Sequence, residues 1–291
     1  MQAPMPQSSL AVARRWRGRL LRWATGLGII GLLLSASVRF TRARAAATHP
    51  LRVCADPNAL PFSNERGEGF ENRLAELLAR ELGVKLEYTW WAERRGFFRN
   101  TLKAKRCDVV MGVPAGLEMA ATTEPYYAAS YAFVSRVELG APFDSFDDPR
   151  LRTLRVGVAL VGDDGVNSPP VHALARRGII DNVVGFNVFG DYADPAPLAT
   201  PVRAVDNGVV DVAIVWAPVA AYFARQSSQP LVVRELKKAN DAGIPQRFAV
   251  ALGVRRDDAE LRARLNAFLK ARRPEIARLL SNYGIDGERT R

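Results

Sequence analysis

The sequence holds few of the side chains that metal binding and hydrolytic catalysis need. Among its 291 residues there are two histidines, His49 and His172, and two cysteines, Cys54 and Cys107. These are too few for an evident zinc site, and no Ser/His/Asp set has an obvious spacing. The GxSxG, Walker and GxGxxG motifs are also missing. We therefore expect no catalytic residues, no metal and no cofactor, and we interpret His172 as an ordinary helix residue.

The first 47 residues have the composition of an export signal. Five arginines between positions 14 and 22 precede an apolar run of 16 residues, Trp23 to Val38, and small residues follow it up to Ala47. Cleavage after Ala45 or Ala47 would remove this segment. The alternative is a retained membrane anchor, although a span needs about 20 apolar residues. We expect residues 1–47 to be a cleaved signal peptide and the mature protein to be periplasmic, without a membrane span.

Most of the positive charge belongs to that signal. The formal net charge of the chain is +11, and residues 1–47 contain eight arginines and no acid, which leaves +3 for the remainder. A nucleic-acid-binding protein needs its cations on the folded domain, where they neutralise phosphates. The remaining chain therefore gives no support for nucleic-acid binding. Its length suits two lobes around large cores.

The two cysteines fit an exported protein. Cys54 lies in the strand-like run 51–55, and Cys107 directly precedes the strand-like run 108–113. If these strands are neighbours, an oxidising compartment would let the cysteines pair and close a loop of about 50 residues, adding about 2–4 kcal/mol of stability. Two buried free thiols are the alternative. We expect the disulfide.

From residue 51 onward, short apolar runs alternate with amphipathic segments. Strands are predicted at 51–55, 85–91, 108–113, 154–160, 183–189, 209–217 and 248–254, and helices at 70–83, 96–106, 171–178, 201–208 and from 258 to near the end of the chain. Apolar strands separated by helices favour an α/β fold of mostly parallel sheets flanked by helices. The pattern restarts near residue 154, which predicts two lobes with a hinge between them.

The second lobe is predicted to be inserted within the first. Lobe 1 would contain residues 48–137 and 247–291, and lobe 2 residues 138–246. The final segment has one strand and helical segments, too few elements to cover its own apolar face, so it should return to lobe 1. Two independent domains in sequence are the alternative.

The ends of the predicted strands supply a candidate cleft for a ligand or a partner, since open α/β sheets bind ligands beyond the carboxyl ends of their strands. For each aromatic residue there, simple packing is the alternative, and for the acidic GDDG turn the alternative is a solvated helix cap. Acid/base chemistry by that turn or by Glu118, as in a dehydratase, is a third reading. The candidate residues are Asp56, Phe62, Trp91, Arg94, Arg95, Pro114, Asp163, Asp164 and Trp216.

Several separated blocks resemble one protein family. Nearly all of residues 51–291 resembles the type II periplasmic solute-binding proteins, including their hinged two-lobed fold. A narrower resemblance, to the quinoprotein dehydrogenase-associated branch of XoxJ and MxaJ type and closer to XoxJ, rests on residues 51–83, 94–116, 122–134 and 161–179. It implies a PQQ-dependent methanol dehydrogenase of the lanthanide type as partner, and its c-type cytochrome as a further one.

The resemblance also brings out a difference from the amino-acid receptors of this fold. Those receptors place an arginine shortly after the strand that corresponds to 108–113, and an aspartate at the end of the second-lobe strand. Here residues 107–135 contain no lysine or arginine, and Trp216 stands in the place of the aspartate. We therefore expect a flatter, less charged ligand or a protein segment. A transport receptor for a small solute other than an amino acid, serving an ABC permease, is the alternative function.

Overall fold

The computed structural model describes residues 49–160, 167–189 and 193–285. The chain divides into Met1–His49 and a second compact unit, Pro50–Arg291, whose fold is given below. The predicted signal peptide lies outside the described residues. Among the described helices, none is long and apolar enough to cross a membrane.

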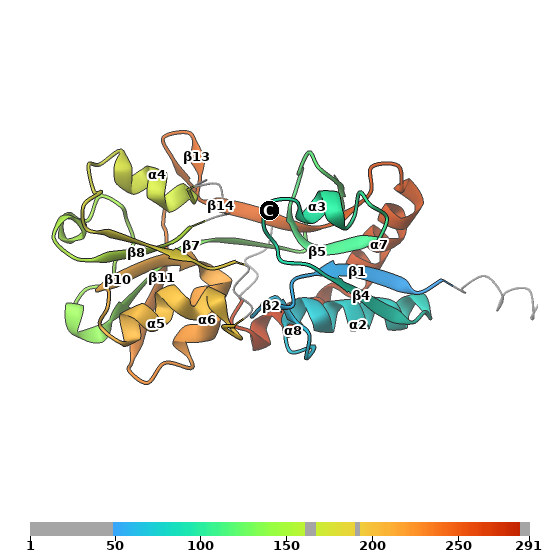
Figure 1. The fold of residues 1–291 in the computed structure, drawn as a ribbon, viewed down its shortest axis with the longest axis horizontal. Helices are drawn as coiled ribbons and strands as arrows, with labels where there is room; N and C mark the ends of the chain where they lie inside the picture. Colours follow the sequence, from blue (N-terminus) through green and yellow to red (C-terminus); the bar gives the residue numbers. More distant parts are fainter. Residues whose placement is uncertain (1–48, 161–166, 190–192, 286–291) are drawn as a thin grey trace, which may run out of the picture. The chain divides into compact units, whose positions relative to one another are not determined.

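Eight strands follow one another in a continuous mixed sheet, and two more pair alongside (Figure 1). At one end β4 (Leu86–Trp90), β1 (Leu51–Ala55) and β5 (Val109–Pro114) run parallel. At the other end β10 (Val212–Trp216), β8 (Val156–Leu160) and β9 (Val183–Asn187) run parallel. We name the two parallel groups, with the helices that cover them, lobe 1 and lobe 2. This α/β arrangement confirms the predicted fold class.

Two long antiparallel strands join the lobes. β7 (Tyr127–Arg136) pairs with β14 (Arg247–Val254) through its first residues, and with β10 and β11 (Leu231–Glu235) through its last. β14 continues beside β5 and β6 (Ala121–Thr122). The chain therefore passes between the lobes twice in extended form. The predicted boundaries after 137 and before 247 fall beside these strands and stay a prediction.

Helices cover both faces of each parallel group. Buried leucines of α2 pack on one face of lobe 1, and Gly83 ends that helix in the left-handed conformation, at φ 67°. Lobe 1 has α2 (Phe70–Leu82), α3 (Phe97–Asn100), α7 (Ala259–Ala271) and α8 (Arg273–Asn282), and lobe 2 has α4 (Pro169–Ala175), α5 (Thr200–Asp206) and α6 (Ala217–Ala224). The short elements are β2 (Asn58–Ala59), β3 (Ser63–Asn64), β12 (Asn240–Asp241), β13 (Ile244–Pro245), η1 (Val137–Leu139), η2 (Pro149–Arg152) and η3 (Pro197–Ala199).

The disulfide between Cys54 and Cys107 confirms the predicted pairing, with the two Cα atoms 5.4 Å apart. It lies in a small apolar cluster with Phe97 and Leu102, separate from the main lobe 1 cluster that contains α2. The bond joins β1 to the residue that leads into its neighbour β5. Both thiol positions are essentially buried.

Two helix predictions were wrong in extent. The helix expected over 96–106 ends at Asn100, because the Thr101 hydroxyl donates to the Phe97 carbonyl at 2.6 Å and the chain turns back toward Cys107. The single helix expected after 258 is interrupted at Arg272. Pro274 explains the break, since proline has no N–H to donate and its ring would clash with the carbonyl of Lys270.

Candidate functional site

Two of the predicted cleft aromatics lie where the lobes meet. Trp216, at the end of β10, is half-buried and packs against the hydrophobic clusters of both lobes. Phe62 does the same from the loop after β1. The Trp216 ring centroid lies 5.4 Å from that of Tyr131 in β7 and 6.0 Å from that of Phe248 in β14. These two predicted residues therefore contact both halves of the fold.

A chain of ring contacts leads from Phe62 to Trp216. The Phe62 ring meets Phe70 edge-on at 5.5 Å, and Phe70 meets Tyr127 edge-on at 5.9 Å. Trp216 in turn lies close enough to the Tyr127 hydroxyl to act on its pKa, in the lowering direction. Burial raises the pKa of Tyr127 well above its usual range, so this phenol stays neutral. We name Phe62, Phe70, Tyr127 and Trp216, with the carboxyls described next, the interlobe site.

Asp56 braces the loops that frame this site. Its side chain is buried, and its two carboxylate oxygens accept backbone N–H groups of Asn58 at 3.0 Å and of Glu93 at 2.6 Å. Burial raises the pKa of Asp56, while these two bonds and the nearby Arg94 act in the opposite direction. The carboxylate thus ties the loop after β1 to the loop after β4.

Two further carboxyls belong to the interlobe site, and sequence reasoning missed them. Glu71 opens α2 and its carboxyl lies against Gly112 of β5, where any side chain would collide with it. Burial, and then the charge of Glu93, raise the pKa of Glu71 well above its usual range. Glu93 reaches solvent, yet burial and then the charge of Asp56 raise its pKa to about 8. The charge of Asp56 thus acts on Glu93, and the charge of Glu93 acts on Glu71, so the three carboxyls form one electrostatic group.

A sequence signal existed for only one of them. Glu93 lies two residues after the predicted strand 85–91, where the strand-end rule applies, although that rule was applied only to its neighbours Arg94 and Arg95. Glu71 lies at the start of a helix, and its carboxyl contacts Gly112, which is 41 positions further along the chain. Only the tertiary fold brings these two residues together. The site consequently contains two acidic side chains that the predicted set did not include.

The remaining predicted residues take other positions in the fold. Trp91 packs on the cluster around the disulfide, and Pro114 is exposed at the end of β5. Arg94 and Arg95 are exposed beside Glu93 in the loop after β4. Asp163 and Asp164 lie outside the described residues. Their roles stay predictions.

The stretch without lysine or arginine supplies the buried phenols. Tyr126 donates its hydroxyl to the Met111 carbonyl at 3.0 Å, and its ring meets that of Tyr127 at 4.9 Å. Burial raises the pKa of Tyr126 well above its usual range. A cation in place of Tyr127, which is buried, would have to be desolvated at a cost of several kcal/mol.

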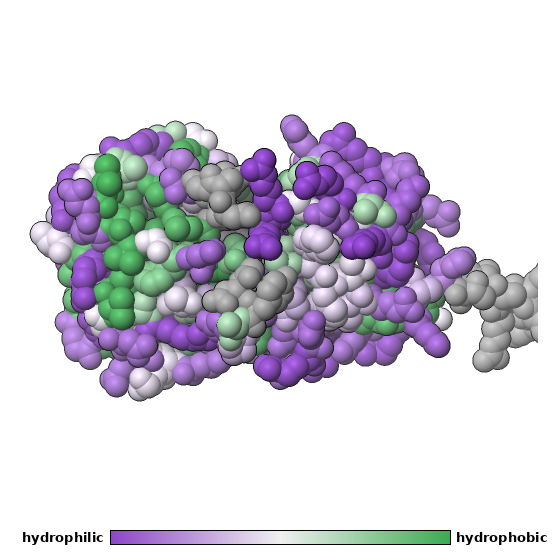
Figure 2. Space-filling view, viewed as in Figure 1, coloured by the Kyte–Doolittle hydropathy of each residue, from purple (hydrophilic) through white to green (hydrophobic). Residues whose placement is uncertain are grey.

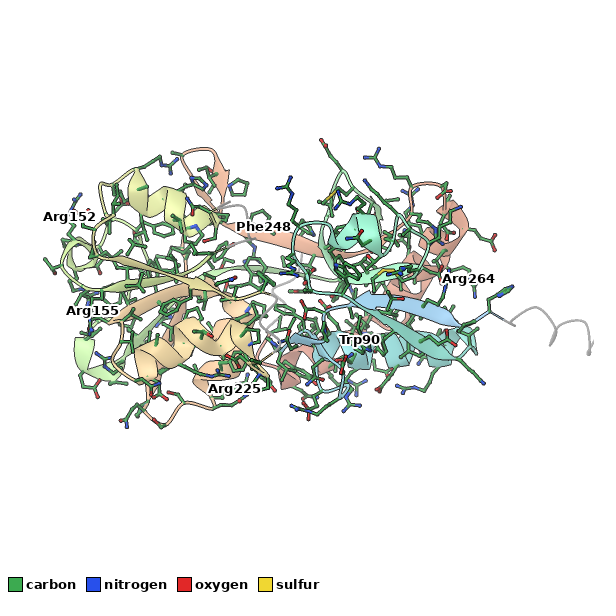
Figure 3. The ribbon with its side chains drawn as sticks, viewed as in Figure 1. Trp90, Arg152, Arg155, Arg225, Phe248 and Arg264 are labelled. Atoms are coloured by element: carbon green, nitrogen blue, oxygen red, sulfur yellow. A yellow bond between two sulfur atoms is a disulfide. The ribbon has the colours of Figure 1, made fainter. Side chains whose placement is uncertain are left out.

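The lobes also contact each other directly. The Asn58 amide donates to the Asp194 carbonyl at 2.9 Å. Ala59 and Leu60 are buried in the lobe 2 cluster, beside Leu198 of η3. At a second place, Arg225, directly after α6, donates to the Asn282 carbonyl at the end of α8, 3.3 Å away (Figure 3). Side chains of the protein itself therefore hold the two lobes together.

The chemistry of the interlobe site follows from this inventory. It offers carboxyls, a neutral phenol, an indole and benzene rings, which suit cationic, hydrogen-bonding or aromatic groups. Within the described ranges, no group of three or more His, Cys, Asp or Glu side chains is arranged to hold a metal ion. The site disfavours a free carboxylate, because the raised pKa values of its own carboxyls show that it already opposes the burial of negative charge.

Comparison with known proteins agrees with this architecture. The sequence pattern of the bacterial extracellular solute-binding proteins, family 3, matches residues 51–284. Protein MoxJ of Methylorubrum extorquens is 30% identical over 81% of this chain and 80% of its own length, and Protein MoxJ of Paracoccus denitrificans is 30% identical over 91% and 96%.

Solved structures extend the similarity. Periplasmic binding protein XoxJ from Methylobacterium extorquens AM1 has 31% identity and a TM-score of 0.68, covering 82% of this chain and 99% of XoxJ. MxaJ from Methlophaga aminisulfidivorans MPT has 30% identity and a TM-score of 0.69, covering 81% and 98%. An ancestral cationic amino acid solute-binding protein, 23% identical with a TM-score of 0.63, covers 80% and 95% and shares the fold. The resemblance found in the sequence is confirmed.

Proposed function

Because this chain belongs to the bacterial extracellular solute-binding proteins, family 3, we propose that it is a periplasmic, non-catalytic accessory protein of a PQQ-dependent methanol dehydrogenase. Similarity to MoxJ, XoxJ and MxaJ over about four fifths or more of the chain supports this partner. The proposal includes a dehydrogenase of the lanthanide type, a role in its activation or maturation, and its c-type cytochrome as a further partner.

The position of Trp216 carries the binding part of this proposal. A solute receptor needs polar groups that converge on its ligand. Trp216 instead fills the end of β10 with an indole that contacts the rings of Tyr131 and Phe248 and packs on both lobes. This arrangement supports a site that receives an aromatic or basic segment of a partner protein in preference to a free zwitterion.

The lobe division supports a mechanism. We propose that residues 48–137 and 247–291 form one lobe, that residues 138–246 form the other, and that β7 and β14 act as the hinge. Hinge motion on two extended strands would change the spacing of Phe62 and Trp216, which contact both lobes. A bound partner segment would then favour one spacing over the other.

Co-purification with the dehydrogenase tests the proposal. Phe62→Ala and Trp216→Ala should each weaken recovery of the complex, because each removes a large ring from the interlobe site. Trp91→Ala is the matched control, since it removes an equally half-buried ring next to the disulfide cluster. Thermal melts confirm that all three variants are folded. Equal recovery of the dehydrogenase with all three would refute a partner contact at the interlobe site.

Glu71 gives specific support to a second candidate function, the receptor of an ABC transporter for a small solute other than an amino acid. Its carboxyl has no hydrogen-bond partner among the described residues, so it is available to a cationic solute. A ligand that binds only the folded protein raises its melting temperature. Screening amines, alcohols, aldehydes, PQQ and lanthanide ions by thermal shift distinguishes the two functions. A large shift with a solute, together with no association with the dehydrogenase, would favour transport.

A further inference from the structure

Three turns of lobe 1 enclose a hollow of about 490 Å³ that is separate from the interlobe site. The turns follow α3, β5 and β14. Figure 2 shows mostly hydrophilic side chains over α3 and the loops beside it. We name this feature the basic hollow, and its lining residues are Leu102, Lys103, Lys105, Glu118, Met119, Arg255, Arg256 and Asp257.

The floor of the basic hollow is held firmly in place. Arg255 donates to the Cys107 carbonyl at 2.6 Å, and it forms ion pairs with Asp108 at 3.0 Å and Asp258 at 3.3 Å. Cys107 is itself fixed by the disulfide. A preformed floor lowers the entropy cost of binding. The charge of Arg255 is offset by these acids, so other side chains must supply any attraction for a ligand.

Lys103 and Lys105 supply that attraction. Both are exposed, and neither forms an ion pair or side-chain hydrogen bond within the described residues. Lys105 also has a left-handed backbone, at φ 57°, which costs a residue other than glycine about 1–2 kcal/mol. The Arg52 guanidinium, which donates to the Lys105 carbonyl at 3.0 Å, helps to hold this conformation. The turn itself explains this conformation, because the Lys105 N–H donates to the Leu102 carbonyl and the Arg106 N–H donates to the Thr101 carbonyl, as at a helix C-terminus, and the turn fixes Lys105 at the edge of the hollow.

The rest of the lining indicates what kind of anion fits. Met119 is 46% exposed, which is unusual for so large an apolar side chain, and Leu102 lies buried beside it in the lining. Glu118 and Asp257 add negative charge, so a uniformly anionic surface such as a phosphate backbone or an acidic membrane would meet repulsion. A protein segment can place carboxylates on the lysines and an apolar side chain on Met119.

We propose that the basic hollow docks an acidic segment of a partner protein, in which carboxylates face Lys103 and Lys105 and a neighbouring apolar side chain covers Met119. This inference goes beyond the accessory function above, because it concerns a different surface of the chain. It holds or fails independently of the interlobe site and of the identity of the dehydrogenase.

Fluorescence anisotropy with a labelled peptide of alternating glutamate and leucine tests the proposal on the purified protein. We expect saturable binding at low salt that weakens as salt is added, and at least about tenfold weaker binding of the matching glutamine and leucine peptide. Lys103→Glu combined with Lys105→Glu should abolish binding. Lys85→Glu combined with Lys270→Glu makes the same change in net charge at two exposed lysines outside the hollow and should leave binding intact.

Three outcomes would overturn the proposal. The first is no binding of the glutamate peptide at low salt. The second is equal loss in both double variants, which would reveal attraction to the net charge alone. The third is binding of anionic lipid vesicles that depends on Lys103 and Lys105 and is stronger than peptide binding, which would identify a membrane surface as the occupant.

Lys105→Gly separates binding from folding. Glycine adopts the left-handed conformation without strain, so the variant should melt at the same temperature as the wild type or above it. It should nevertheless bind the glutamate peptide several-fold more weakly, because it lacks the ammonium group. Unchanged peptide affinity in this stable variant would show that Lys105 plays no part in docking. Since the dehydrogenase is absent from this assay, neither result bears on the accessory function.

Discussion

The ring of Tyr283, in the turn after α8, stacks on the ring of Tyr222 in α6, with centroids 5.8 Å apart and planes inclined by 18°. One ring belongs to lobe 1 and the other to lobe 2. Tyr283 also donates its hydroxyl to the Glu68 carbonyl at 2.6 Å and meets Phe70 of the interlobe site at 5.8 Å. The end of the chain thereby connects lobe 2 to the helix start that carries Glu71.

We expect Tyr283→Ala to loosen the contact between the lobes. The substitution removes the stack on Tyr222 and the contact with Phe70, and it should lower the free energy of unfolding by about 2 kcal/mol. Urea unfolding measures the loss, and the distance between spin labels on α2 and α5 measures any opening. Tyr283→Phe is the matched control, because it keeps the ring and loses only the hydrogen bond to Glu68. Equal stability and equal label distances in Tyr283→Ala and wild type would contradict the expected role.

Reduction of the disulfide should destabilise lobe 1. Cys54 and Cys107 are separated by 53 positions, and a bond that closes such a loop contributes about 2–4 kcal/mol through the unfolded chain. The melting temperature should therefore fall in the presence of a reductant. Cys54→Ser combined with Cys107→Ser should melt at the lower temperature with or without the reductant. A wild-type melting temperature that is insensitive to full reduction would contradict this expectation.

The sequence pattern was informative wherever one apolar period dominated. β1, α2, β4 and β5 lie within about a residue of their predicted ranges, because alternating apolar runs and a leucine-lined helix leave little choice. β7 was not delimited, since its alanines, serines and tyrosines fit several structures and its pairing with both lobes is a tertiary property. α6 was missed because the segment that follows Trp216 continues the apolar strand with alanine, proline and valine.

Some residues of the candidate site could be predicted from the sequence and others could not. Phe62 and Trp216 could be predicted, because strand ends are readable in the sequence and both residues contact the two lobes. Trp91 also lies at a strand end, yet it packs on the disulfide cluster. Successive residues of an extended chain face opposite sides of the sheet, and the preceding residue, Trp90, packs on the main lobe 1 cluster. The partnership of Glu71 with Gly112 depends on how α2 packs on β5, which no local pattern encodes.

The carboxyl of Glu93 should make stability depend on pH. Its pKa in the folded protein is about 8, above the usual value of 4.5, so the folded state binds its proton more tightly than the unfolded state. The contribution to stability is therefore greatest below about pH 4.5 and is lost as the pH rises through 8. Glu93→Gln should flatten the dependence between these limits and make the protein relatively more stable at pH 9. Urea unfolding from pH 5 to pH 9 measures this, and parallel profiles of wild type and variant would contradict it.

The close approach of Glu71 to Gly112 leads to the last prediction. A methyl group at position 112 would overlap the Glu71 carboxyl, so Gly112→Ala must displace that carboxyl; because it is the end of a flexible, half-buried side chain, the cost should be no more than about 1 kcal/mol of stability. Glu71→Ala alone removes a half-buried carboxyl that has no described partner, and combined with Gly112→Ala it removes the overlap. The double variant should then be more stable than Gly112→Ala, with a coupling energy of about 0.5 kcal/mol in a double-mutant cycle. Additive effects in urea unfolding would mean that the two residues do not constrain each other, and that the carboxyl is free to leave the interlobe site.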